Sequence, residues 1–166
     1  MSPLAAPAKV AFVGLHSSAI HGSRLPALYT CDGRDIPPPL TWGAVPSEVH
    51  ELALFALAVN TREAGQSSLA VVWAMAGVNP ALHHLSAGEV PPGAFLLTTT
   101  DGQRRYSICP PRGQTKSYEF ALLALPSRAS ATPAIPGVSL LRNLAAPSAE
   151  THAPAEGVLS IKYTRR

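Results

Sequence analysis

The sequence predicts a mainly β protein built of packed antiparallel β-sheets with one or two short helices. The 166 residues include 17 prolines and 12 glycines, and this content of turn residues disfavours long helices. Two apolar runs have the length of buried strands, and two later segments begin or continue with alternating apolar and polar residues. A chain of this length is typical of one domain. We therefore expect a single domain over residues 1–166, with a loose N-terminal lead-in at residues 1–9.

The first quarter of the chain predicts short extended pieces separated by loops. A strand is expected at residues 10–15, a loop at 16–24 and a brief extended piece at 28–30. Asp32-Gly33 is a turn signal. Leu40 and Trp42 are two residues apart, so we expect them to face the same side of an extended segment.

The two apolar runs, at residues 51–60 and 69–75, predict central strands covered on both faces. The alanine and leucine content of the first run would also permit a helix. We favour a strand, because the neighbouring runs are short and bounded by proline and polar residues. Residues 81–85 are expected to form one helical turn.

The second half of the chain predicts two more strands and a helix. Residues 95–100 are expected to be extended or irregular, and residues 117–125 begin with a strand-like alternation. Leucines at residues 140, 141 and 144 form one stripe of a helix at 138–145, which Pro147 ends. Alternation over residues 157–163 predicts a closing strand.

Composition and charge exclude several classes of function. The net charge is only +3, and the basic residues are scattered without interleaved aromatic residues, so we expect no nucleic-acid partner. No apolar run reaches the roughly 20 residues that span a bilayer, so we expect no transmembrane segment. The N-terminus lacks the pattern of a secretory signal. We expect a cytoplasmic protein, with the mitochondrial matrix or another organelle interior as the alternative.

The two cysteines, Cys31 and Cys109, do not form a CxxC pair, and no cluster supplies zinc ligands. His83 and His84 are adjacent, so their rings are expected to point apart. We therefore expect neither a metal nor a cofactor. The simpler interpretation of the cysteines is two reduced thiols in a reducing compartment, with one disulfide as the alternative. For Cys109, a buried small side chain is favoured over a reactive thiol.

Four segments, taken in order, resemble one known family. They are Leu25 to Trp42 with its Asp-Gly turn and Pro-Pro pair, the two apolar runs, Tyr106 to Phe120 with Cys-Pro-Pro-Arg-Gly, and Ala155–Arg165. This order is similar to the phosphatidylethanolamine-binding protein family, in its bacterial Raf-kinase-inhibitor-like branch. The resemblance covers about residues 10–166 and implies that family's β fold.

The resemblance also implies a surface cavity for phosphate-like or carboxylate head groups. The proline loops that follow Asp32 and Cys109 would rim it, and the family lines it with two Asp, two His and a Tyr. Gly33 is expected to adopt backbone angles closed to other residues, and tandem prolines pre-order a loop. The candidate ligand-binding residues are Asp32, Pro38, Tyr106, Cys109, Pro110, Pro111 and Lys116.

The matched positions differ from the family pattern. The two acids correspond to Val59 and Thr61, the His of the second central strand to Leu69, and the other His to Lys116, while Tyr106 matches the family Tyr. Apolar side chains cannot donate to anion oxygens, so burying a phosphate beside them is costly. We expect a degenerate pocket with weak or altered anion binding, in which Lys116 is either a point charge or a solvated surface residue.

The expected function is that of a non-enzymatic binding or regulatory protein whose partner is a small anionic ligand or another protein. The alternative is a structural or interaction subunit of a larger assembly, such as a mitochondrial one, or a homodimer, that keeps the fold without binding a ligand. Two features motivate this structural alternative: the joint loss of the family's acids and histidines, and a charged content of only 14%. A hydrolase using Tyr106 or Cys109 is a third hypothesis, although the chain lacks a nucleophile elbow and a phosphate-binding loop.

Overall fold

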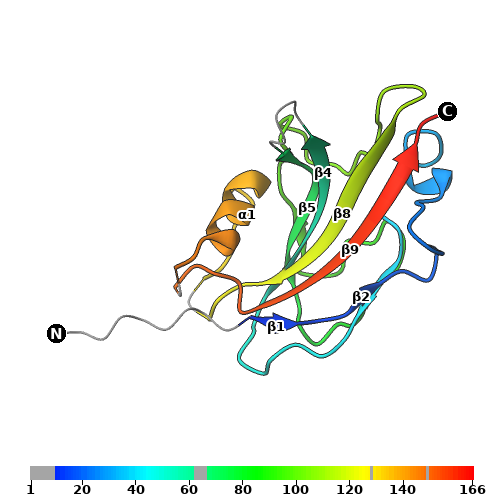
Figure 1. Cartoon of the computed structure of the whole chain (residues 1–166). Helices are drawn as coiled ribbons and strands as arrows, with labels where there is room; N and C mark the ends of the chain where they lie inside the picture. Colours follow the sequence, from blue (N-terminus) through cyan, green and yellow to red (C-terminus); the bar gives the residue numbers. More distant parts are fainter. Residues whose placement is uncertain (1–9, 62–66, 128, 149) are drawn as a thin grey trace.

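The computed structural model describes residues 10–61, 67–127, 129–148 and 150–166. Its strands form two sheets, one in the order β1-β9-β8-β4-β5-β7 and one in the order β2-β3-β6 (Figure 1). The larger sheet consists of β1 (Ala11–Phe12), β4 (Leu52–Thr61), β5 (Ser67–Val78), β7 (Phe95–Leu96), β8 (Thr115–Ala124) and β9 (Ala155–Thr164). The smaller sheet consists of β2 (Leu15–His16), β3 (Leu40–Trp42) and β6 (His84–Leu85). The prediction of a mainly β fold with packed sheets is confirmed.

The first apolar run forms the centre of the larger sheet. β4 pairs antiparallel with β5 on one side and with β8 on the other, and its residues from Leu52 to Ala58 are buried. Successive side chains of a strand point to opposite faces, so β4 contributes to two cores. Leu54 and Ala56 belong to the core between the two sheets, whereas Phe55 and Leu57 belong to the core on the other face.

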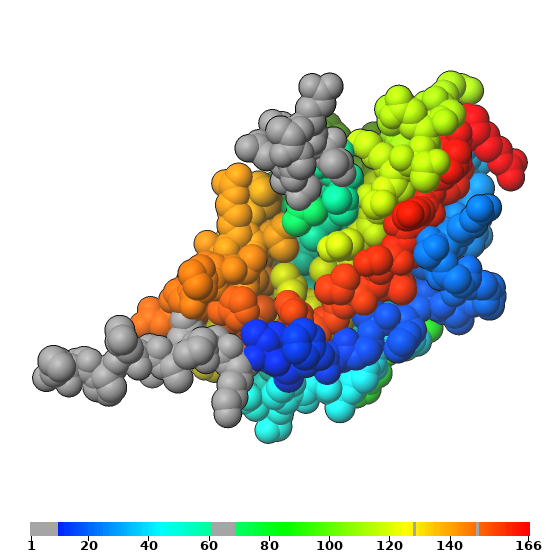
Figure 2. All heavy atoms as spheres, in the orientation of Figure 1, coloured from blue at the N-terminus to red at the C-terminus, as the bar shows by residue number. Residues whose placement is uncertain are grey.

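An α-helix covers that second face of the larger sheet (Figure 1). α1 (Gly137–Ala145) buries Leu140 and Leu144 against it. The helix starts close to the sheet, because a Cβ on Gly137 would lie 2.8 Å from the Cβ of Ala74. Figure 2 shows β8 and β9 crossing this view diagonally, with the helix region on one side and the segment before β3 on the other.

The short elements differ from the sequence-based expectations. The strand expected at 10–15 is divided into β1 and β2. The piece at 28–30 is part of a 3-10 helix, η1 (Ala27–Tyr29), closed by a hydrogen bond from the backbone N–H of Tyr29 to the carbonyl of Pro26. The helical turn expected at 81–85 is wrong, because β6 pairs there with β3.

The expectation of two reduced thiols is also wrong. Cys31 and Cys109 form a disulfide across 78 residues of sequence, with their Cα atoms 5.2 Å apart. Cys109 is exposed rather than buried. Because the fold alone brings the two loops together, the spacing of the cysteines in sequence gives no sign of this pairing.

Candidate functional site

The two proline loops lie side by side, as the family resemblance implies. Besides the disulfide, the backbone N–H of Cys31 donates to the carbonyl of Ile108 at 3.0 Å. The N–H of Ile108 donates in turn to the Asp35 carboxylate at 3.0 Å. These links fix the Asp-Gly turn against the loop that contains Cys109. The site is therefore built on a cross-linked junction of two segments distant in sequence.

Gly33 is required for a different reason from the one expected. Its φ is not in the positive region. A Cβ at this position would instead lie 2.5 Å from the carbonyl oxygen of Ala27 and from the Cα of Leu28. The residue with unusual backbone angles is Asp35, with φ of 51°, and its bond to Ile108 stabilises that conformation.

One hollow of about 400 Å³ lies over the ends of β4, β5 and β8. We call it the Lys116 hollow. Its polar lining comes mainly from Lys116, Tyr118 and the loop between β7 and β8. The lining residues are Ala58, Asn60, Ala70, Val71, Val72, Thr99, Thr100, Asp101, Gln103, Arg105, Ser107, Cys109, Lys116 and Tyr118.

Hydrogen bonds to the backbone of β5 hold the loop that forms one wall of this hollow. The hydroxyl of Thr100 accepts from the N–H of Val71 at 2.8 Å, and the N–H of Thr100 donates to the carbonyl of Val71 at 2.9 Å. Farther along, the N–H of Ser107 donates to the carbonyl of Val72 at 3.1 Å. In its bond with Val71 the Thr100 oxygen is the acceptor. That bond does not use the hydroxyl proton, which can therefore be donated to a ligand.

The hollow combines two cations with one anion. Lys116 is half-buried, and Arg105 is exposed. The hydroxyl of Thr99 and then the N–H of Gln103 donate to Asp101, and these bonds lower the pKa of that carboxyl. Asp101 is therefore charged at neutral pH, and the described lining has a net charge of about +1, from two cations and one anion.

Tyr118 is a pocket residue that the family comparison by sequence missed. It lies two residues after Lys116 on β8, so both side chains face the hollow. Burial, and next the charge of Asp35, raise the pKa of Tyr118 to about 12. The phenol therefore keeps its proton at neutral pH and can act as a hydrogen-bond donor. The alternation at the start of this strand was a signal that could have identified it.

Val59 and Leu69 were expected to stand where the family has pocket side chains. Neither lines the Lys116 hollow, although their neighbours in sequence do. Val59 is half-buried and does not line the Lys116 hollow, whereas Ala58 and Asn60 do. Leu69 is 50% exposed and also lies outside this lining. A shift of one residue along a strand changes the face. Thr61 ends β4, and its side chain lies outside the described part of the structure.

Tyr106 lines a separate hollow of about 310 Å³ beside the first. Its ring is buried, and its hydroxyl donates to the carbonyl of Tyr29 at 2.7 Å. Burial, followed by the charges of Asp35 and Tyr118, raises the pKa of Tyr106 well above its ordinary value. Arg105 lines both hollows. Residues 34–37, which follow Asp32, line this second hollow, whereas Cys109 lines the Lys116 hollow.

The other candidate ligand-binding residues lie in or beside the two proline loops, and only some of them line a hollow. Cys109 and Lys116 line the Lys116 hollow. The carboxylate of Asp32 accepts hydrogen bonds from the hydroxyl of Tyr163 and the N–H of Arg166. Three prolines complete the set and lie outside the described lining of both hollows: Pro38 and Pro110 are buried, and Pro111 is exposed.

Metal chemistry finds no support in the described residues. They contain no group of three or more His, Cys, Asp and Glu side chains that could hold a metal ion. His83 and His84 are both exposed. No helix in the described part of the chain is long and apolar enough to cross a membrane.

These features define a class of protein with a β fold, cross-linked proline loops and a small polar hollow beside them. Residues 16–164 match the family model described as Phosphatidylethanolamine-binding protein. The chain belongs to this family, as the resemblance of its motifs indicated.

Curated relatives cover part of the chain. One is the UPF0098 protein Mb1945c of Mycobacterium bovis, 36% identical over 64% of this chain and 50% of its own length. Another is LppC of Mycobacterium tuberculosis, which has the name of a candidate lipoprotein and is 32% identical over 75% of this chain and 60% of its own. The aligned parts thus span between half and three fifths of these two relatives.

Two solved structures share the fold over nearly the whole chain. The phosphatidylethanolamine-binding protein homologue CT736 of Chlamydia trachomatis superposes with a TM-score of 0.75 at 26% identity, covering 93% of this chain and 98% of its own. YbcL of Escherichia coli gives a TM-score of 0.75 at 18% identity, covering 93% and 99%. At the latter identity the likeness concerns the fold alone.

Proposed function

We propose that this chain is a non-enzymatic binding protein whose Lys116 hollow takes a small anion, such as a phosphate-type or carboxylate group. The observation that supports this most directly is the set of donors in the hollow. Lys116, Tyr118 and Arg105 line it together with the hydroxyl of Thr100. Charged donors make the strongest hydrogen bonds to such oxygens.

The affinity is expected to be modest. Asp101 places a negative charge in the same lining, and Ala58 and Val72 supply no donor. The net charge of about +1 favours an anion only weakly in an open, solvated site. A dissociation constant in the millimolar to high micromolar range is therefore expected for a simple anion, equivalent to about 4–6 kcal/mol.

The chemistry of the hollow supports binding more than catalysis. Cys109 is part of a disulfide, so its sulfur is not a free thiolate nucleophile. The hydroxyl of Tyr106 is buried and bonded to the carbonyl of Tyr29. Neither residue named in the hydrolase hypothesis is thus placed to attack a substrate in the Lys116 hollow.

We further propose an extracytoplasmic location in place of the cytoplasmic one expected from the sequence. Disulfides persist mainly in oxidising compartments, and this chain has one between Cys31 and Cys109. The relative LppC is named as a candidate lipoprotein. Fractionation of the source cells, with thiol labelling before and after reduction, tests this. Free thiols in a cytosolic fraction would contradict it.

The test of the proposed function is calorimetric titration with inorganic phosphate, phosphoethanolamine and acetate. We expect binding of at least one anion, weakened about fivefold in Lys116→Gln because a charged donor is lost. Arg112→Gln is the matched control, since Arg112 is exposed and outside the described lining of the hollow. No binding at millimolar concentrations would contradict the proposal and favour the alternative of an interaction subunit.

A further inference from the structure

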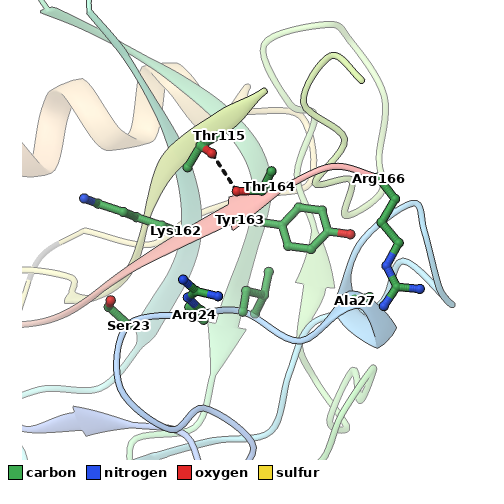
Figure 3. A pocket seen from close by; sticks show the side chains of 9 residues that line it. Ser23, Arg24, Ala27, Thr115, Lys162, Tyr163, Thr164 and Arg166 are labelled. Atoms are coloured by element: carbon green, nitrogen blue, oxygen red, sulfur yellow. Dashed lines mark hydrogen bonds between the residues drawn. The ribbon is translucent and has the colours of Figure 1, made fainter. Parts of the chain in front are cut away.

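A third hollow, larger at about 520 Å³, lies where the segment before η1 runs beside the end of β9. The backbone joins the two directly: the N–H of Leu25 donates to the carbonyl of Lys162 at 3.0 Å, and the N–H of Lys162 donates to the carbonyl of Ser23 at 2.7 Å. Arg24 projects from this junction, so we call the hollow the Arg24 groove. Figure 3 shows its lining.

The described lining of the Arg24 groove contains three cations and no acid. The cations are Arg24, Lys162 and Arg166, and all three are exposed. Within the described residues, the ion pair found at 4.0 Å or less joins Arg165 to Asp32 and involves none of them. The lining is therefore more positive than that of the Lys116 hollow, where Asp101 opposes Lys116 and Arg105.

Asp32, whose carboxylate is hydrogen-bonded to two residues that line the groove, has its own partners. Asp32 accepts from the hydroxyl of Tyr163 and from the N–H of Arg166, and the guanidinium of Arg165 lies 4.0 Å away. Its charge is thus shared mainly with groups at one end of the groove. Arg24 and Lys162 are therefore available to bind an anion that enters the groove from solvent.

Hydroxyl groups supply neutral donors between the cations. Thr115 of β8 and Thr164 of β9 are opposite each other in register, and their hydroxyl oxygens are 2.6 Å apart (Figure 3). Only one of the two protons is used in that bond, so the other hydroxyl can donate to a ligand. Ala27 is half-buried and adds a small apolar surface, whereas Leu25 lines the groove but is almost fully buried.

The cations are spread along the groove. In Figure 3, Arg24 lies between Lys162, which extends to one end, and Arg166, which lies at the other end beside the ring of Tyr163. Arginine forks bind phosphate oxygens in a bidentate manner, and lysine adds a point charge. An ester with an organic body would occupy more of this length than a bare ion.

We propose that the Arg24 groove is a second anion site, which binds a phosphate ester, either a free small molecule or a lipid head group. Arg24 and Arg166 supply charged donors along the groove, the hydroxyls of Thr115 and Thr164 add a neutral donor, and the small apolar surface contacts the organic body. This site does not depend on the Lys116 hollow and shares none of its described lining residues.

The test is a titration of 15N-labelled protein with glycerol 3-phosphate, followed by amide chemical shifts. We expect saturable shifts at Leu25 and Thr164, and their affinity should fall about tenfold or more in the Arg24→Gln/Arg166→Gln double variant, because two charged donors are lost. Arg142→Gln, an exposed arginine on α1, is the matched control and should bind as the parent does. If the double variant does not fold, Arg166→Gln alone should show a smaller loss.

The second arm uses sedimentation with vesicles of phosphatidylglycerol in phosphatidylcholine and separates the two sources of the phosphate. Vesicle binding lost in the double variant assigns a lipid head group, whereas shifts with glycerol 3-phosphate alone assign a free ester. Absence of both would overturn the proposal, and so would an equal loss in Arg142→Gln. Shifts at Thr100 and Ser107 without any at Leu25 and Thr164 would overturn this second site and leave the proposed function standing.

Discussion

The hydroxyl of Tyr163 donates a hydrogen bond to the carboxylate of Asp32, 131 residues earlier in the chain. The N–H of Arg166 donates to the same carboxylate at 3.1 Å. Together with the adjacent disulfide of Cys31, these bonds attach the Asp-Gly turn to both β9 and the loop before β8. The candidate site is thus stabilised at the point where three distant segments meet.

This relationship predicts a pH dependence of stability. The hydroxyl of Tyr163, followed by the N–H of Arg166, lowers the pKa of Asp32 below its ordinary value of 3.8. A carboxyl with a lowered pKa adds stability above its unfolded-state pKa, and this is lost as pH falls through the folded-state pKa. We expect Asp32→Asn to be less stable than the parent at pH 7, with the difference shrinking below about pH 4.

Urea unfolding at several pH values measures this difference. Glu48→Gln provides the control, because Glu48 is exposed and has no hydrogen bond among those found in the described residues. An Asp32→Asn variant with the same stability deficit at pH 3 as at pH 7 would show that the charge of the carboxylate is not responsible.

The disulfide should contribute substantially to stability. It closes a loop of 78 residues, and a cross-link of that length restricts the unfolded chain. We expect reduction, or the Cys31→Ser/Cys109→Ser double variant, to lower the free energy of unfolding by roughly 2–5 kcal/mol. Thermal unfolding with and without reductant measures it. A midpoint independent of reductant in the parent protein would contradict this assignment.

Gly33 should tolerate no side chain. A Cβ there would lie 2.5 Å from backbone atoms of Ala27 and Leu28, so the turn must move. We expect Gly33→Ala to cost roughly 2 kcal/mol or more. Gly43→Ala is the matched control, because a Cβ at Gly43 meets nothing within 4 Å. Equal stabilities of the two variants in urea would refute this account of the turn.

The charge of Asp101 should oppose anion binding in the Lys116 hollow. Asp101→Asn removes that charge and keeps an oxygen that can accept from Thr99 and Gln103. We expect the affinity for phosphate to rise about fivefold, since one nearby charge in a solvated site is worth about 1 kcal/mol. Calorimetry compares the variant with the parent. A weaker or unchanged affinity would place the anion away from Asp101.

The sequence was sufficient to predict the central strands and the helix. The leucine stripe of α1 has the period of a helix. The continuous apolar run in β4 has no such period, so its short length and its proline and polar flanks decided for a strand. Leu40 and Trp42 face one side, as expected, and both are buried in β3. The short elements were harder to predict from the sequence. The formation of a two- or three-residue strand such as β6 depends on its partner strand rather than on its own residues.

The candidate site was predicted only in part. Lys116 and Cys109 line the hollow, but Ala58 and Asn60 do so in place of Val59, because a register of one residue decides the face of a strand. β5 also has an irregularity in its pairing with β4 between Ala56 and Leu57, which no sequence pattern reveals. The disulfide depends on loops that are brought together only by the fold.

Anion binding in the Lys116 hollow is the central feature proposed for this protein. Amide chemical shifts of the labelled protein during titration with inorganic phosphate test this directly, because Thr100 and Ser107 lie in its wall. We expect saturable shifts at these two amides, with a dissociation constant that rises in Lys116→Gln and stays unchanged in Arg112→Gln. Shifts that do not saturate, or that are the same in both variants, would contradict the central claim.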